Sequence, residues 1–194
     1  MTRLYHHRYF IVNTTTQNET NTKECIIINN QDKNRYVKEQ ITTTLLQLLQ
    51  KRTCADISIS EITMIAEVGR ASFYRNFTDK TDVLKQHVMY LTQKWGTEFE
   101  SNPDSNPQNL FGSLFQHYKD NDNFYLLLFR NHLTELILDT ILEICGPKAE
   151  ASNIDAYSKS FFAYGLYGWI VEWMMRGMQE SADEMNTLLT NALH

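Results

Sequence analysis

Apolar side chains recur at helical spacing along almost the whole chain after Lys33, and no segment alternates apolar and polar residues convincingly enough for a strand. The first stripe runs from Tyr36 to Leu49, with apolar positions three and four residues apart. Only 7 Gly and 3 Pro occur in 194 residues, which suits helices because both residue types interrupt them. The pattern predicts an all-α protein of about nine helices.

Residues 1–31 have a different composition from the rest. Asn and Thr dominate Asn13–Asn30, and no helical period persists there. We expect a disordered or loosely attached N-terminal arm. Two alternatives stay open: an artefact of an early start codon, and an arm whose Arg3 and Arg8 enter a DNA minor groove.

Charge is distributed unevenly along the chain, whose formal net charge is −5. Residues 33–95 contain ten Lys/Arg and six Asp/Glu, whereas residues 96–194 contain five Lys/Arg and fourteen Asp/Glu. A basic front half and an acidic back half predict that only the front faces a polyanion such as nucleic acid.

The basic half contains a signal for a short helix and a turn. The S-x-x-E segment from Ser58 to Glu61 is a capping box, in which each residue's side chain is expected to bond the other's backbone amide. A short helix to Ala66 should follow. It should end in a turn where Gly69 relieves an unusual backbone conformation.

A second short helix follows at once, from Arg70 to Phe77, and Thr78-Asp79 caps a longer one from Lys80. Phe73 and Phe77 lie four residues apart and should anchor the second helix to the core. Arginine in its first turn opposes the helix dipole but suits a phosphate. Two short helices joined by a tight turn predict a helix-turn-helix. Its polar face would carry Arg70, Ser72, Tyr74, Arg75 and Asn76.

The far half is predicted to be helical again after the break at Ser101–Pro107. Gly146-Pro147 should end one helix there, and an S-x-x-E box from Ser181 to Glu184 should open the last one. The expected helices cover Leu110 to Tyr118, Phe124 to Phe129, Leu133 to Ile144, Asn153 to Gly177, and the segment after Ser181.

Signatures of catalysis and of metal or cofactor binding are missing from the sequence. There is no Gly-rich phosphate loop, nucleophile elbow or paired acid and base, so we expect no enzyme and no cofactor. His87, His117 and His132 lack the spacing of a metal site. No apolar run could span a membrane and no secretory signal is recognisable, so we expect a cytoplasmic protein. Three unpatterned cysteines fit reduced, buried thiols: Cys25, Cys54 and Cys145.

Three segments, residues 57–62, 66–77 and 79–84, resemble the signature of the TetR family of transcriptional regulators. The aromatic residue of the second short helix, the Phe after it and the downstream Lys all fall in register. The resemblance covers about residues 34–95. More loosely, Tyr164 to Met178 resembles the end of that family's ligand and dimerisation domain.

The resemblance implies an N-terminal three-helix DNA-binding domain at residues 32–79, whose family domain extends to about residue 95. A helical effector-binding and dimerisation domain would occupy residues 80–194. It implies a homodimer through the last two helices, about 153–178 and 182–193, on a palindromic double-stranded operator. The expected function is a repressor released by a small molecule, although activation by the same architecture stays open.

Carried over position by position, the resemblance implies a set of DNA contacts, with Lys80 on phosphate. Three positions depart from the family pattern. Glu67 replaces the turn glycine, Gly69 replaces the usual Ser cap, and Ser60 stands where relatives often carry Arg. The departures keep open a helical adaptor that works through a protein partner instead of DNA. The implied contacts are Ser58, Ser60, Arg70, Ala71, Ser72, Tyr74, Arg75, Asn76 and Lys80.

Aromatic residues of the second half are candidates to line a ligand pocket, the alternative being that they fill the core. Gly165 and Gly168 inside a helix each cost about 1 kcal/mol relative to Ala, which close helix approach within the subunit or across a dimer would offset. The pocket candidates are Trp95, Phe99, Phe111, Phe115, Tyr118, Tyr125, Phe129, Tyr164, Trp169 and Trp173.

Overall fold

A computed structural model describes residues 30–192, which contain nine α-helices, one 3-10 turn and no strand. The predicted all-α fold is confirmed. Of the expected arm, residues 1–29 lie outside the described part of the chain, and Asn30 and Gln31 already belong to the first helix. The first elements are α1 (Asn30–Leu49), η1 (Cys54–Asp56), α2 (Ile59–Ile65) and α3 (Arg70–Asn76).

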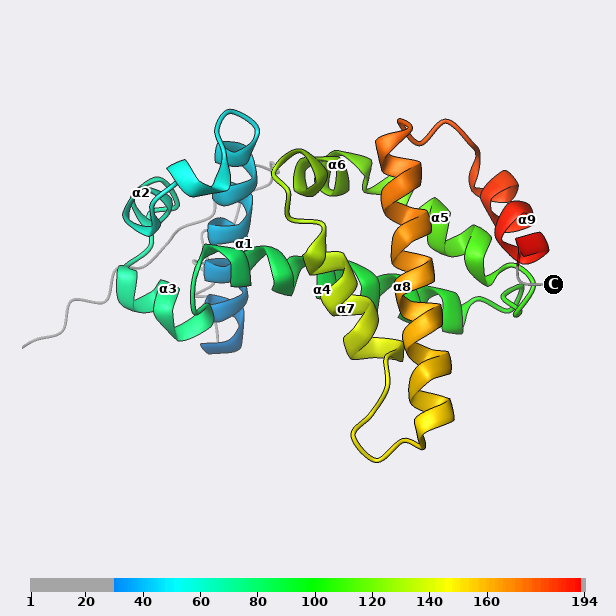
Figure 1. Ribbon diagram of the computed structural model, residues 1–194. Coiled ribbons are helices and arrows are strands. Elements are labelled where there is room, and N and C mark those ends of the chain that lie inside the picture. The colour runs from blue at the N-terminus through cyan, green and yellow to red at the C-terminus, as the bar shows by residue number, and fades with distance from the viewer. Residues whose placement is uncertain (1–29, 193–194) are drawn as a thin grey trace, which may run out of the picture.

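The first three helices form a cluster at one end of the molecule (Figure 1). Helix α1 packs against α2 and α3 because its apolar stripe meets theirs. Leu45, Ile62 and Phe73 are fully buried where the three helices meet. The predicted anchors Phe73 and Phe77 are both buried, so α3 is held by one face and exposes the other.

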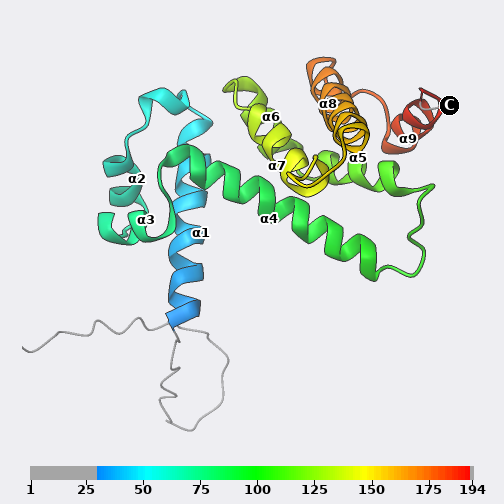
Figure 2. The ribbon, with the colours of Figure 1, turned by 60° about the horizontal axis from the view of Figure 1, so that its bottom comes forward.

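Helix α4 (Lys80–Ser101) connects this cluster to the rest of the molecule. Figure 2 shows it running from the cluster to the far end, beneath the C-terminal helices. Asp79 caps its start by accepting a hydrogen bond from the Asp82 amide at 2.8 Å. Val83, Leu84 and Val88, in the first half of this helix, are fully buried. A single 22-residue helix therefore links both ends of the fold.

The C-terminal helices pack as a second body whose core is rich in aromatic side chains. Helix α5 lies against α9, and α7 lies against α8 and α4. Phe115, Tyr125 and Ile170 are fully buried between them. No helix among residues 30–192 is long and apolar enough to cross a membrane. The helices are α5 (Leu110–Asp120), α6 (Asp122–Arg130), α7 (Glu135–Cys145), α8 (Asn153–Met175) and α9 (Ala182–Ala192).

The capping box before α9 is confirmed in both directions. The Glu184 amide donates to Ser181 Oγ at 3.2 Å, and the Ser181 amide donates to Glu184 Oε2 at 2.7 Å. Hydrogen bonding from Ser181 to the carboxylate, chiefly from its backbone amide, holds the pKa of the Glu184 carboxyl below its ordinary value. Buried thiols were expected, but Cys54 and Cys145 are only half-buried, because each lies at a helix end beside solvent.

Candidate nucleic-acid interface and ligand cleft

The capping box before α2 forms in one direction only. Ser58 Oγ accepts the Glu61 amide at 3.1 Å as predicted. The reciprocal bond was predicted wrongly, because the Glu61 carboxylate accepts from Arg52 Nη2 instead. The Arg52 guanidinium draws the carboxylate away from the Ser58 amide, since a charged donor forms the stronger hydrogen bond.

The turn between α2 and α3 is a Schellman motif. The Val68 amide donates to the Thr63 carbonyl at 3.0 Å, and the Glu67 amide donates to the Met64 carbonyl at 3.3 Å. This motif needs a left-handed residue after the helix, and Glu67 occupies that position with φ of 54°. Gly69 has an ordinary φ of −71° as the N-cap of α3, so the prediction that it relieves an unusual conformation is wrong.

The exposed face of α3 carries two arginines without a carboxylate partner in the described part of the chain. Arg70 Nη1 donates to Ser60 Oγ at 3.2 Å, joining the first turns of α3 and α2. Arg75 Nη2 donates to Ser72 Oγ at 2.7 Å. Hydroxyl oxygens are weak, exchangeable acceptors for a guanidinium, so both charges are available to an incoming anion.

The other predicted contact residues differ in accessibility. Ala71 and Tyr74 are exposed on the same helix. Asn76 is half-buried, and its amide Nδ2 donates to the Ser72 carbonyl at 2.8 Å. Ser58 is exposed, with its hydroxyl engaged in the α2 cap.

Lys80 is occupied within the protein. Its Nζ donates to the carbonyls of Cys54, Ala55 at 3.2 Å and Ile57 at 2.7 Å. These three acceptors match the three donors of an ammonium group. In this conformation Lys80 ties the start of α4 to the segment before α2 rather than extending toward a phosphate.

The two parts of the molecule also meet through Asn131, which sequence reasoning missed. Its Oδ1 accepts the backbone amide of Cys54 at 3.2 Å, and its Nδ2 donates to the Leu127 carbonyl at 2.9 Å. A second Schellman turn, with His132 at φ of 57°, ends α6 at this point. No local pattern in the sequence identifies a contact between residues 77 positions apart.

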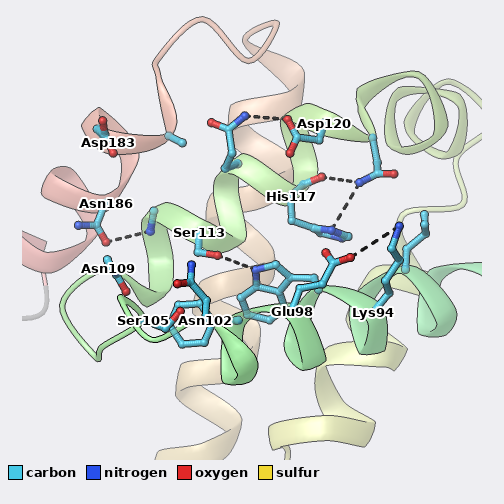
Figure 3. A pocket seen from close by; sticks show the side chains of 17 residues that line it. Lys94, Glu98, Asn102, Ser105, Asn109, Ser113, His117, Asp120, Asp183 and Asn186 are labelled. Carbon is cyan, nitrogen blue, oxygen red and sulfur yellow. Dashed lines mark hydrogen bonds and ion pairs between the residues drawn. The ribbon is translucent and has the colours of Figure 1, made fainter.

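A half-open cleft of about 600 Å³ lies between α4, α5 and the start of α9 (Figure 3). Two of the predicted pocket residues, Trp95 and Phe99, line it. The Trp95 indole donates to Ser113 Oγ at 2.9 Å, which fixes the ring in the wall. Most other lining side chains are polar, so the cleft differs in character from the aromatic pocket that the sequence predicted.

The eight remaining pocket candidates do not line this cleft. Phe115, Tyr118, Tyr125 and Trp173 are buried in the core between the helices, where aromatic rings fill space. Tyr164 is 55% exposed on α8. Half-buried positions are occupied by Phe111, Phe129 and Trp169.

His117 is buried at the floor of the cleft. One ring nitrogen, Nε2, lies 2.8 Å from the Tyr125 hydroxyl. Burial lowers the pKa of His117 to about 4, so the ring is neutral at neutral pH. Across residues 30–192, no three His, Cys, Asp or Glu side chains come together as a metal site.

One face of α8 is apolar and exposed, and its first turns project beyond the neighbouring helices (Figure 1). Ile154, Tyr157 and Phe161 are 71%, 68% and 79% exposed, at helical spacing. Gly165 and Gly168 are exposed farther along the helix. A Cβ atom added to either glycine would meet nothing within 4 Å, so neither serves close packing inside the subunit.

Comparison with known proteins agrees with this architecture. Residues 105–194 match the family TetR_C_8, described as a transcriptional regulator C-terminal region. No protein of curated function is significantly similar to the chain in sequence.

Three solved structures are similar. Lin0861 from Listeria innocua is 18% identical over 83% of this chain and 91% of its own, with a TM-score of 0.67. A TetR transcriptional regulator from Streptococcus agalactiae 2603V is 17% identical over 81% and 93%, with a TM-score of 0.49. The dihydroxyacetone kinase operon activator DhaS is 20% identical over 81% and 93%, with a TM-score of 0.43. The C-terminal half of the chain is thus similar to the C-terminal region of TetR-type transcriptional regulators, and its helical fold with an N-terminal helix-turn-helix is similar to that of Lin0861.

Proposed function

We propose that the chain is a dimeric regulator of transcription that binds a double-stranded operator through residues 58–77, with α3 in the major groove. The observation that carries the proposal is the pair of guanidinium groups of Arg70 and Arg75. They lie on the exposed side of a helix whose other side is anchored by Phe73, and among residues 30–192 only hydroxyl groups accept hydrogen bonds from them.

We expect DNA to replace the serine hydroxyls as the acceptor of these arginines. Arg70, at the first turn of α3, would meet a phosphate or a base edge, and Arg75 would meet the adjacent backbone. Ser60 and Ser72, released from the arginines, could then donate to phosphate themselves. We assign Lys80 to the support of this unit, because its ammonium already has three acceptors.

We infer that dimerisation uses the apolar face of α8, with α9 contributing at its edge. Ile154, Tyr157 and Phe161 are exposed together at helical spacing, which is unfavourable in a monomer, and a partner helix would cover them. Gly165 and Gly168 are open on this surface, as a close crossing of two α8 helices requires. Two copies would then present two α3 helices to successive major grooves.

We favour repression that a small molecule relieves by binding to the protein. We expect the protein to act by binding rather than by catalysis, and in the cytoplasm, where the operator would lie. The physical requirement is that the ligand binds one spacing of the two α3 helices better than another.

The test is selection of random-sequence duplex DNA by the purified protein, followed by sequencing, at a low and a high salt concentration. We expect a palindrome whose half-sites lie about 34–36 Å apart or slightly more, with enrichment falling as salt rises. No enrichment at either salt from a folded dimer would contradict the proposal and favour an adaptor that acts through a protein partner.

A further inference from the structure

We infer that the cleft between α4, α5 and the start of α9 binds a small organic cation, an amine or quaternary ammonium compound with polar substituents. The binding itself is independent of DNA. Its consequence for transcription depends on the function proposed above.

The lining of the cleft includes three aromatic rings that lie close to one another. Trp95 and Phe99 lie with ring centroids 6.0 Å apart, and Trp95 and His117 lie 6.1 Å apart. The hydrogen bond from the Trp95 indole to Ser113 Oγ prevents the ring from turning away. A tryptophan face attracts cations through its quadrupole, more strongly than the other aromatic side chains do.

The rim of the cleft carries more negative than positive charge. Glu98, Asp120 and Asp183 line it from three different helices, whereas Lys94 is the one cation among the lining residues (Figure 3). Lys94 Nζ lies 3.8 Å from Glu98 Oε1 and offsets that carboxylate alone. Two carboxylates therefore remain in excess.

The two excess carboxylates, Asp120 and Asp183, have no cationic partner among residues 30–192. Asp120 Oδ1 accepts a hydrogen bond from the neutral Gln116 amide at 2.8 Å, which leaves the charge uncompensated. The Asp183 carboxylate has neither a hydrogen bond nor an ion pair within residues 30–192. His117 at the floor is neutral and adds no positive charge. Anionic ligands are accordingly disfavoured.

The three walls are tied together, so the cleft is preformed. Asn186 of α9 accepts the Gly112 amide of α5 at 2.9 Å and donates to the Gln108 carbonyl at 3.1 Å. A Cβ atom added to Gly112 would lie 3.4 Å from the Asn186 side chain, so α5 and α9 pack closely at this point. A volume of about 600 Å³ falls within the range of small-molecule sites.

Helix α4 connects the cleft to the helix-turn-helix at residues 58–77. Trp95 and Lys80 lie on the same helix, 15 residues or about 22 Å apart. A ligand held between α4 and α9 favours one tilt of α4, and the other end of α4 is bonded to the segment before α2. Ligand and operator affinities would then be coupled reciprocally.

The experiment uses choline and its uncharged isostere 3,3-dimethylbutan-1-ol, which match in shape and differ in charge. Each is titrated into the full-length protein without DNA, and the indole N–H resonance of Trp95 is followed by NMR. The resonance is assigned with a Trp95→Phe variant. We expect saturable shifts with choline and an affinity at least about tenfold lower for the alcohol.

Matched variants locate the site. Asp120→Asn combined with Asp183→Asn should weaken choline binding about tenfold while leaving the fold unchanged, because both side chains are exposed. Glu150→Gln, in the exposed α7–α8 loop, should leave it unchanged. Equal affinity for choline and the alcohol, no effect of the double variant, or no Trp95 shift at about 50 mM choline would each overturn the inference. Because no DNA is present, these outcomes are separate from failure of the proposed function.

Discussion

Replacement of Glu67 by glycine tests whether the helix-turn-helix turn carries backbone strain. Glu67 has a φ of 54° at the position of the Schellman motif that glycine occupies most often. A non-glycine residue in this region costs roughly 1–2 kcal/mol, because its Cβ atom crowds the following carbonyl. The third Schellman turn of the structure, after α8, has glycine there: Gly177, with φ of 80°.

The expected gain in stability is smaller than the full strain. Glycine removes the strain of about 1–2 kcal/mol but loses roughly 0.5–1 kcal/mol through the greater freedom of the unfolded chain. Glu67→Gly should therefore raise the free energy of unfolding by about 0.5–1 kcal/mol. The side chain is exposed and contributes nothing to the core, so no packing loss opposes this gain.

The assay is urea unfolding of wild type, Glu67→Gly and Glu67→Ala, followed by circular dichroism. Glu67→Ala removes the same carboxylate but keeps a Cβ atom in the left-handed region, so it isolates the backbone effect. We expect the midpoint of Glu67→Gly to exceed that of Glu67→Ala at an unchanged m-value. Equal midpoints for the two variants would refute the argument that the turn is strained.

Three further predictions concern other parts of the fold. Gly69→Ser should add about 0.3 kcal/mol of stability in thermal unfolding, because space for a Cβ atom exists and a hydroxyl at the α3 N-cap can accept a free amide; a loss of stability would contradict the assignment of that cap. The folded-state pKa of His117 is about 4 and the unfolded value is near 6.5. The contribution of His117 to the free energy of unfolding is therefore fully present above pH 6.5 and is lost as the pH falls toward 4. This group should contribute a loss of about 2 kcal/mol from pH 7 to pH 5, which His117→Gln should abolish in urea titrations; an unchanged pH dependence would show that the ring is not held neutral. Gly168→Glu should convert the proposed dimer into a folded monomer in analytical ultracentrifugation, whereas Gly96→Glu, at a helix position on α4 that also has room for a Cβ atom, should leave that dimer intact. Dissociation of both or neither would contradict the proposed α8 interface.

Local patterns predicted the helices well because local interactions determine them. The spacing of Phe73 and Phe77 was enough to identify the buried face of α3, and Ser58 was identified as the α2 cap from its neighbours alone. The turn was predicted wrongly because a glycine shows where an unusual φ is tolerated, not where one is needed. Gly69 takes an ordinary conformation and Glu67 takes the unusual one.

Features that depend on how helices pack together could not be predicted from the sequence. The bond from the Cys54 amide to Asn131 and the enclosure of Lys80 by three carbonyls join residues far apart in the chain. The polar cleft arises from the approach of α9 to α5 at Gly112, which no periodicity reveals. Aromatic composition indicated a pocket, but of the ten aromatic residues named only two line the cleft, and four fill the core instead.

The most direct test of the central claim is the salt dependence of binding to the selected duplex for wild type, Arg75→Ala and Arg70→Ala. Neither arginine is buried, so both variants should fold and have the same oligomeric state as wild type. We predict weaker binding, and for each phosphate contact removed a decrease of about 1 in the slope of log affinity against log salt. Affinity and slope equal to wild type in both variants would contradict the assignment of α3 as the DNA-binding helix.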